Sequence, residues 1–165
     1  MGTTDNLRTA FAGESQANQT YMAYAKKAKA DGRPQIAKLF RAAAASETVH
    51  AQAHLRVLGV QTTADNLRAA MGGEESEFTT MYPGFVAQAE QEDKPQALIS
   101  FRNALAVERI HYGLYREALA SVDEGEDLPE AAIFVCGVCG NTVIGEAPDV
   151  CPVCGAPKVK FSEIA

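Results

Sequence analysis

Residues 34–50 read PQIAKLFRAAAASETVH, and residues 95–111 read PQALISFRNALAVERIH. The two stretches align without a gap at a separation of 61 positions, and they share a leading proline, a Phe-Arg pair, two alanines, a glutamate and a histidine. Proline is well tolerated in the first turn of a helix, and alanine is the best helix former. Chance likeness between two alanine-rich helices would not explain the matching glutamate and histidine, which packing does not require. The repeat therefore predicts a two-helix unit used twice, as a bundle with approximate twofold symmetry.

The rest of the chain extends this pattern to four helical regions. We expect helices over residues 4–30, 34–59, 63–92 and 95–123. Gly72-Gly73 should interrupt the third helix and Pro83-Gly84 should bend it, because glycine and proline weaken helix interiors. The predicted fold class is mainly α, an antiparallel four-helix bundle over residues 1–130 with its linker.

The tail, residues 131–165, has a different character. It is short, it is rich in glycine and proline, and it contains all four cysteines. The apolar runs 133–135 and 142–144 predict short strands. We therefore expect a separate small β domain after an acidic linker.

Composition excludes several classes of function. The 165 residues suit one or two small domains, and the net charge of −6 gives no general attraction for nucleic acid. No segment approaches the roughly 18–20 apolar residues that span a bilayer, so we expect no membrane partner. The N-terminus lacks the charged and apolar pattern of an export signal, which predicts a cytoplasmic location. Thiols stay reduced there, so metal binding is a better prediction for the cysteines than disulfides.

The repeated glutamate and histidine predict metal ligands. Glu47 and His50 stand three residues apart and share a helix face, and Glu108 and His111 do the same. One such pair alone is weak evidence for a metal site, because surface helices often carry one. Two pairs in equivalent repeats are much stronger evidence. A di-iron or di-manganese site in a four-helix bundle takes one further glutamate from each remaining helix.

Each remaining helix offers a candidate. Glu14 lies on an apolar stripe of the first helix, where an unpaired carboxylate would be costly to bury, although a position at the edge of the stripe is the alternative. The third helix offers Glu77, chosen because its spacing to Glu108 resembles that of Glu14 to Glu47. Glu74, one turn earlier on the same face, is the main competitor.

The predicted set balances the charge of two divalent ions. Glu47 and Glu108 are the expected bridges, and Glu14 and Glu77 the terminal ligands; these four carboxylates are also the groups available for proton transfer. One imidazole on each ion favours iron over magnesium or calcium. His54 is expected outside the ligand set. Tyr21 either hydrogen-bonds a ligand carboxylate or is an ordinary core residue.

Four cysteines predict a second metal site. They form two Cys-x-x-Cys-Gly motifs, at Cys136, Cys139, Cys151 and Cys154. This spacing suits a structural zinc ribbon as well as a mononuclear iron site. A domain this small needs its metal to fold in either case. The di-iron prediction favours iron, because an iron held by four thiolates cycles one electron at a time and zinc does not.

Taken together, these motifs resemble the rubrerythrin family over nearly the whole chain. The resemblance is carried by the stretch AFAGESQA at 10–17, by both Glu-x-x-His pairs, by Met81-Tyr82-Pro83, and by GEAP and CPVCGAP in the tail. It implies a ferritin-like bundle followed by a rubredoxin-like domain. It also implies reduction of hydrogen peroxide to water, an electron donor that is a rubredoxin or an NAD(P)H-dependent reductase, and a homodimer that brings the tail iron of one chain near the di-iron site of the other.

One position departs from the family pattern. Rubrerythrins carry Glu-x-x-Glu before Met-Tyr-Pro, and Thr80 stands here in place of the second glutamate. In the family that carboxylate trades places with the histidine equivalent to His50, so we expect His50 to stay bound in both oxidation states. The departure also leaves open a ferroxidase, oxygen-reducing or iron-storage function. A zinc-ribbon interaction module on a helical scaffold is the remaining alternative.

Overall fold

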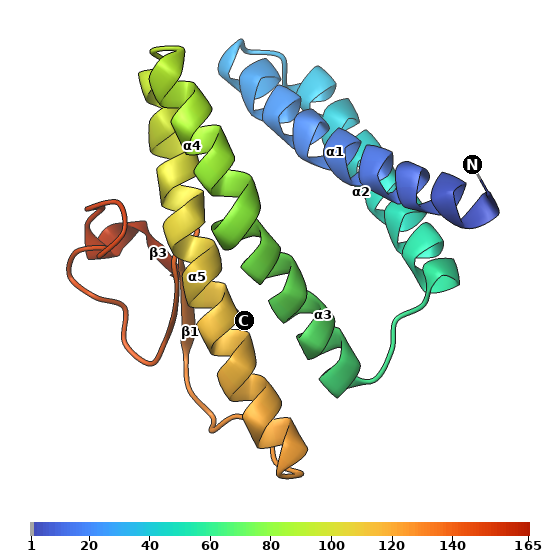
Figure 1. Cartoon of the computed structure of the whole chain (residues 1–165). Helices are drawn as coiled ribbons and strands as arrows, with labels where there is room; N and C mark the ends of the chain where they lie inside the picture. The colour runs from blue at the N-terminus through green and yellow to red at the C-terminus, as the bar shows by residue number, and fades with distance from the viewer. Residues whose placement is uncertain (1) are drawn as a thin grey trace. The chain divides into compact units, whose positions relative to one another are not determined.

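The computed structural model describes residues 2–165 and divides the chain into two compact units, Met1–Gln61 and Thr62–Ala165. The first unit is a helical hairpin of α1 (Thr3–Ala30) and α2 (Pro34–Leu58) (Figure 1). The chain reverses at Gly32, whose φ of 72° suits glycine. Pro34 stands in the first turn of α2, as predicted.

Small residues bring α1 and α2 close together. The buried hydrophobic residues of the hairpin are all alanines: Ala25, Ala28, Ala37, Ala44 and Ala51. Between the two helices, the Asn18 amide donates to the Ala44 carbonyl at 2.7 Å and to the Thr48 hydroxyl at 2.9 Å. These two bonds fix the register of α1 against α2.

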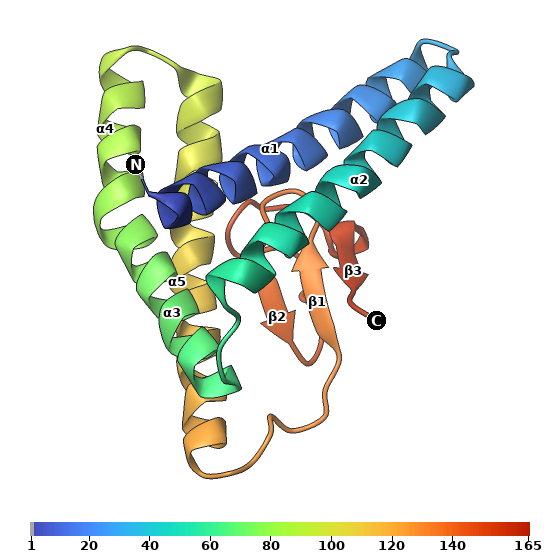
Figure 2. The ribbon, with the colours of Figure 1, turned by 90° about the vertical axis from the view of Figure 1, so that its right-hand side faces the viewer.

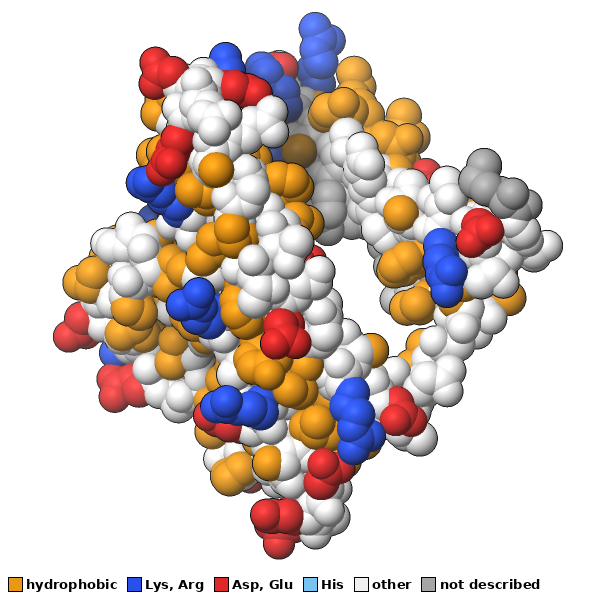
Figure 3. Space-filling view, viewed as in Figure 1, with side chains coloured by type: hydrophobic (Ala, Val, Ile, Leu, Met, Phe, Trp, Pro, Cys, Tyr) orange, Lys and Arg blue, Asp and Glu red, His pale blue; other side chains and the backbone are white. Residues whose placement is uncertain are grey.

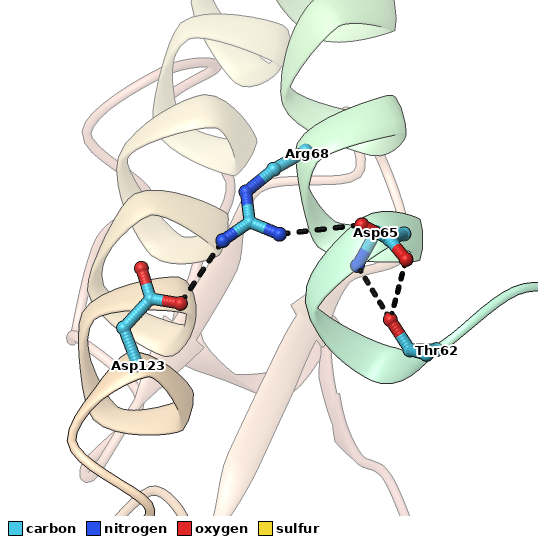
Figure 4. A network of polar contacts seen from close by, with 4 residues as sticks. All are labelled: Thr62, Asp65, Arg68 and Asp123. Carbon is cyan, nitrogen blue, oxygen red and sulfur yellow. Dashed lines mark hydrogen bonds and ion pairs between the residues drawn. The ribbon is translucent and has the colours of Figure 1, made fainter.

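The helices of the second unit are α3 (Thr63–Ser76), the π-helical turn η1 (Glu77–Met81), α4 (Tyr82–Gln91) and α5 (Pro95–Asp123). Figure 4 shows how the start of α3 is held against the end of α5. The backbone N–H of Asp65 donates to the Thr62 hydroxyl, which caps the helix. Arg68 then pairs with Asp65 at 3.3 Å and with Asp123 at 3.0 Å.

The predicted break at Gly72-Gly73 is wrong, because α3 runs through both residues. Packing of α3 against α5 outweighs a propensity cost of about 1 kcal/mol for each glycine. The irregularity comes later, at η1, where the Tyr82 N–H bonds the Glu77 carbonyl five residues back. Phe78 of η1 packs edge-on against Tyr112 of α5, with ring centroids 5.6 Å apart. Pro83 lies just after this turn, at the start of α4.

The tail forms a three-stranded sheet in the order β2-β1-β3, with both pairings antiparallel (Figure 2). The strands are β1 (Ile133–Cys136), β2 (Thr142–Ile144) and β3 (Phe161–Glu163), and the short helix η2 (Lys158–Lys160) precedes β3. The first two strands confirm the prediction, whereas β3 was not predicted. Strand β2 lies against α5 within the second unit.

Hydrophobic side chains are mixed with charged ones on the face drawn in Figure 3. Among residues 2–165, no helix has the length and apolar character needed to cross a membrane. The predicted domain boundary near residue 130 stays a prediction, since the tail belongs to the same compact unit as α3, α4 and α5.

Candidate metal sites

The first unit carries a cluster of three potential metal ligands, Glu14, Glu47 and His50. The Glu47 carboxylate lies 2.9 Å from His50 Nδ1, one turn along α2. Glu14 comes from α1, and the bonds made by Asn18 one turn later hold it level with Glu47. The three ligand atoms lie within 4.8 Å of one another. Ligand atoms on one ion at about 2.1 Å each lie within about 4.2 Å of one another, so small side-chain movements suffice to bind a metal.

The second unit carries a cluster of the same composition, Glu74, Glu108 and His111. His111 Nδ1 lies 2.9 Å from Glu108 and 3.7 Å from Glu74. The side chains of these residues are between 16% and 26% exposed, which is enough for an ion to enter and little enough to make unpaired charge costly. The structure thus gathers each predicted Glu-x-x-His pair with one further glutamate.

The acids of the second cluster repel one another. Burial raises the pKa of Glu74, and the nearby Glu108 carboxylate raises it further. The pKa of Glu77 is also raised, first by burial and then by Glu108. Carboxylates this close are most stable around a shared cation, so the electrostatics fit a metal site.

The terminal ligand predicted on the third helix was Glu77, and the geometry favours its competitor. Glu74 belongs to the cluster within 4.8 Å, whereas Glu77 lies near enough to Glu108 to feel its charge but falls outside the cluster. The two acids are three residues apart and share one face of the helix. Two carboxylates of the third helical region therefore face Glu108.

The four cysteines form the third cluster. Cys136 Sγ lies 3.8 Å from Cys154 Sγ, and Cys139 Sγ lies 3.6 Å from Cys151 Sγ. A tetrahedral ion with metal–sulfur bonds of about 2.3 Å separates its sulfurs by about 3.8 Å, so the four thiols fit one ion. Cys136 and Cys151 are 1% and 2% exposed, which shields two of the ligands from water.

Amide groups surround these sulfurs. Burial raises the pKa of Cys151, but hydrogen bonds from the backbone of Cys154 and Val153 outweigh it and lower the value to about 7. Asn141 is 2% exposed; its backbone amide bonds the Cys139 sulfur, and its side chain donates to Cys151 Sγ at 3.8 Å. Such bonds stabilise thiolates, the form that binds metal.

Comparison with known proteins identifies the family. Residues 5–119 match the rubrerythrin family, and residues 134–162 match the rubredoxin-like domain of rubrerythrin. The chain belongs to the rubrerythrin family. It is 35% identical to rubrerythrin-2 of Clostridium acetobutylicum, over 96% of this chain and 95% of that protein. It is 33% identical to nigerythrin of Nitratidesulfovibrio vulgaris, over 97% of this chain and 85% of that protein.

A solved structure of nigerythrin in a partially reduced state has a similar fold, with a TM-score of 0.59 at 31% identity over 99% of this chain and 88% of that one. These matches confirm the predicted fold class, a mainly helical four-helix bundle followed by a small sheet with four cysteines. They also confirm the resemblance to rubrerythrins. The assignment of individual ligands in this rubrerythrin stays a prediction.

Sequence reasoning overlooked Tyr82. Burial raises the pKa of its hydroxyl, and the negative charges of Glu108 and Glu77 raise it further, which places the side chain near the acids of the second cluster. Its signal was available, because the residue lies in the family stretch Met81-Tyr82-Pro83. Tyr21 packs near Phe40, with ring centroids 6.3 Å apart, as expected of a core tyrosine. Among the described residues, His54 is not a member of the three clusters, and its place outside the ligand set stays a prediction.

The choice between Glu74 and Glu77 has a direct test. We expect Glu74→Ala to weaken metal binding by the second cluster about 10-fold or more, because loss of a residue that only orients a ligand already lowers metal affinity about 10-fold. Glu77→Ala is expected to weaken metal binding less. Glu75→Ala is the matched control, because Glu75 is exposed. Iron titration of the metal-free protein measures the effect. A larger loss in Glu77→Ala would restore the original ligand assignment.

Proposed function

We propose that this rubrerythrin is a peroxide reductase that reduces hydrogen peroxide to water at a di-iron site. The observation that carries the proposal is the pair of matching clusters, each with two glutamates and one histidine, in a chain that also carries a four-cysteine site. Neither cluster alone supplies enough ligands for two ions. The proposed site combines both clusters.

Charge balance supports this combination. Glu14, Glu47, Glu74 and Glu108 carry four negative charges when ionised, and two ferrous ions carry four positive ones. Two imidazoles complete the set and suit iron. When bound, the two irons supply the two electrons that cleavage of the peroxide oxygen–oxygen bond requires.

The chain's own residues position the site and handle protons. Glu47 and Glu108, which lie beside the two histidines, are the proposed bridging carboxylates. The raised pKa of Glu74 and of Glu77 makes these acids suitable proton carriers for the departing water. The half-buried Tyr82 side chain lies near enough to the same carboxylates to feel their charge, and its hydroxyl is a further proposed proton donor for this side of the site.

Electrons return through the four-cysteine site, which is proposed to hold one iron. Amide bonds lower the pKa of Cys151, whereas burial raises the pKa of Cys139 against the opposing bond from the Asn141 backbone, so a bound cation would stabilise the set as thiolates. The proposed donor to this iron is a rubredoxin or an NAD(P)H-dependent reductase. The proposed assembly is a homodimer, and the proposed location is the cytoplasm.

A ferroxidase, oxygen-reducing or iron-storage function is the second candidate. Thr80 favours it, because the usual extra carboxylate of the family is missing at that position. Glu74 and Glu77 argue against the second candidate. They give the third helical region two carboxylates three residues apart, as in the family, but the pair lies one helical turn before the family's position. The Thr80 hydroxyl itself lies 3.4 Å from that of Thr79 within the π-helical turn.

Re-oxidation kinetics test the proposal. The iron-loaded protein is expected to be red, to bleach on anaerobic reduction, and to regain its colour faster with hydrogen peroxide than with an equal concentration of oxygen. Stopped-flow absorption measures both rates. Faster recovery with oxygen would favour the second candidate. A colourless protein containing only zinc, purified from iron-rich medium, would favour the zinc-ribbon module.

A further inference from the structure

The π-helical turn η1 lies between two points at which the third helical region is fixed on α5. Before the turn, Arg68 pairs with Asp123 at 3.0 Å (Figure 4). After the turn, the ring centroid of Phe85 lies 5.4 Å from that of Phe101. A π-helical turn closes over one more residue than an α-helical turn. The turn therefore sets the rotation between the acids that precede it and the side chains that follow it.

Helix geometry shows what this rotation does to Tyr82. In a regular α-helix each residue turns about 100°, so Tyr82 would lie about 80° from Glu74 and about 140° from Glu77 around the axis. The extra residue removes about 100° from the rotation, which places Tyr82 about 20° from Glu74 and about 40° from Glu77. Tyr82 accordingly lies near enough to both acids, and to Glu108, to feel their charges. The turn thus gathers three polar side chains of the third helical region on one face.

Pro83 explains why the helix takes the extra residue. The elements α3, η1 and α4 follow one another without a break, so Pro83 lies inside a continuous helix. In a regular α-helix its ring would clash with the carbonyl of Thr79, four residues back, and proline has no N–H to donate to that carbonyl. A π-helical turn directly before the proline relieves both problems, because it shifts the hydrogen-bond pattern by one residue. The Thr79 hydroxyl also donates to the Glu75 carbonyl, a kind of bond that often bends helices.

Phe78, the second residue of η1, holds the turn against α5. Its ring meets the ring of Tyr112 edge-on, with centroids 5.6 Å apart, and the guanidinium carbon of Arg109 lies 5.4 Å from its centroid. Both kinds of contact are attractive beyond the burial of apolar surface. Each of the two partners directly follows a proposed ligand, Glu108 or His111. The turn is therefore fixed beside the two ligands that α5 gives to the second cluster.

We propose that Pro83 and Phe78 are positioning residues for the second cluster, because they hold η1 in the π-helical form that turns Glu74 toward Glu108. A regular helix with the same two anchors would rotate the acids away from α5, since the Arg68 ion pair is exposed and therefore weak. The first cluster has the same composition but lies on regular helices, so it does not depend on such a turn. This inference rests on the proposed metal binding by the second cluster.

The acceptor of the Tyr82 N–H tests the role of Pro83. NMR couplings across hydrogen bonds identify this acceptor in the full chain loaded with one zinc ion for the four-cysteine site. In the unchanged protein we expect the Glu77 carbonyl, and in Pro83→Ala the Phe78 carbonyl, which is the acceptor in a regular α-helix. Pro95→Ala is the matched control, because it removes a proline from the first turn of α5 and should keep the Glu77 acceptor. An unshifted acceptor in Pro83→Ala would overturn the role of Pro83.

Zinc affinity tests the effect of both residues on the ligands. The chain has three histidines, and the ring 15N shifts of His50 and His111 report zinc binding by the first and the second cluster separately. We expect Pro83→Ala and Phe78→Leu to weaken zinc binding at His111 about 10-fold, as for other residues that orient a metal ligand, and to leave His50 within about twofold. Phe78→Tyr keeps the ring and should stay within about twofold at both histidines. An unchanged affinity at His111, or an equal loss at His50, would overturn the proposal.

These readouts separate the inference from the proposed function, because neither uses peroxide or oxygen. If the variants change zinc binding as expected but the iron-loaded protein reacts faster with oxygen, the proposed function fails and the role of the turn stands. If the protein reacts faster with peroxide but Pro83→Ala and Phe78→Leu bind zinc as the unchanged protein does, the proposed function stands and the role of the turn fails.

Discussion

Replacing Glu47 and Glu108 together by alanine is expected to remove the di-iron site. The variant loses the two proposed bridging carboxylates, and each histidine loses the acid that lies 2.9 Å from its Nδ1. We expect the iron bound by the helices to fall to background and peroxide turnover to drop by at least about 100-fold. Mutation of residues that only orient metal ligands already lowers metal affinity or activity about 10- to 100-fold. Iron analysis and steady-state turnover measure the two effects.

The matched control is the double variant Glu75→Ala and Glu117→Ala. Both glutamates are exposed on α3 and α5, outside all three clusters. Alanine is the best helix former, so both double variants should keep the helical circular dichroism of the unchanged protein. If the Glu47 and Glu108 variant retains its iron and its turnover, the two clusters are not the catalytic site.

Features set by local spacing were predictable from the sequence. The Glu-x-x-His pairs lie on regular helices, where residues three apart always share a face, so their geometry follows from the sequence spacing. The helices that begin at Pro34 and Pro95 were predicted at their first residue for a similar reason. The four cysteines also converge as predicted, because the tight turn of each Cys-x-x-Cys-Gly motif places its two thiols side by side.

The third helical region was harder to predict because it is not regular. The choice of Glu77 rested on its spacing to Glu108, which resembles that of Glu14 to Glu47, and η1 begins at Glu77 itself. One extra residue in a turn rotates everything that follows by about 100° around the helix axis. Glu74 lies before the π-helical turn and Tyr82 lies after it. Helical periodicity alone therefore could not decide which of these side chains approach Glu108.

The contact between His111 and Thr142 was unpredictable for a different reason. The two residues are 31 positions apart, and the linker after α5 has no pattern that specifies where the tail docks. The family resemblance implies a homodimer that brings the tail of one chain near the di-iron site of the other. The structure instead reverses the chain after Asp123 and returns β2 to the helix. The homodimer stays a prediction.

Cys151→Ala is expected to abolish the four-cysteine site while leaving the helices folded. Cys151 is 2% exposed and receives amide hydrogen bonds, so its loss removes one of four thiolates and opens the site. A structural metal contributes about 10–16 kcal/mol in small domains of this kind, far more than the few buried side chains of the sheet. We expect the red colour to disappear, and residues 132–165 to lose protection from amide hydrogen exchange.

The same variant separates one round of chemistry from repeated turnover. If the tail only returns electrons, reduced Cys151→Ala should still consume one equivalent of peroxide per di-iron site, because the ligands on α1, α2, α3 and α5 are intact. Steady-state turnover with the electron donor should fall to background, since the folded tail that returns the electrons is lost. Val138→Ser is the control, because Val138 is 56% exposed in the first Cys-x-x-Cys-Gly motif. This variant should keep both the single round of peroxide consumption and the steady-state turnover. Normal steady-state turnover in Cys151→Ala would mean that electrons reach the di-iron site without the tail.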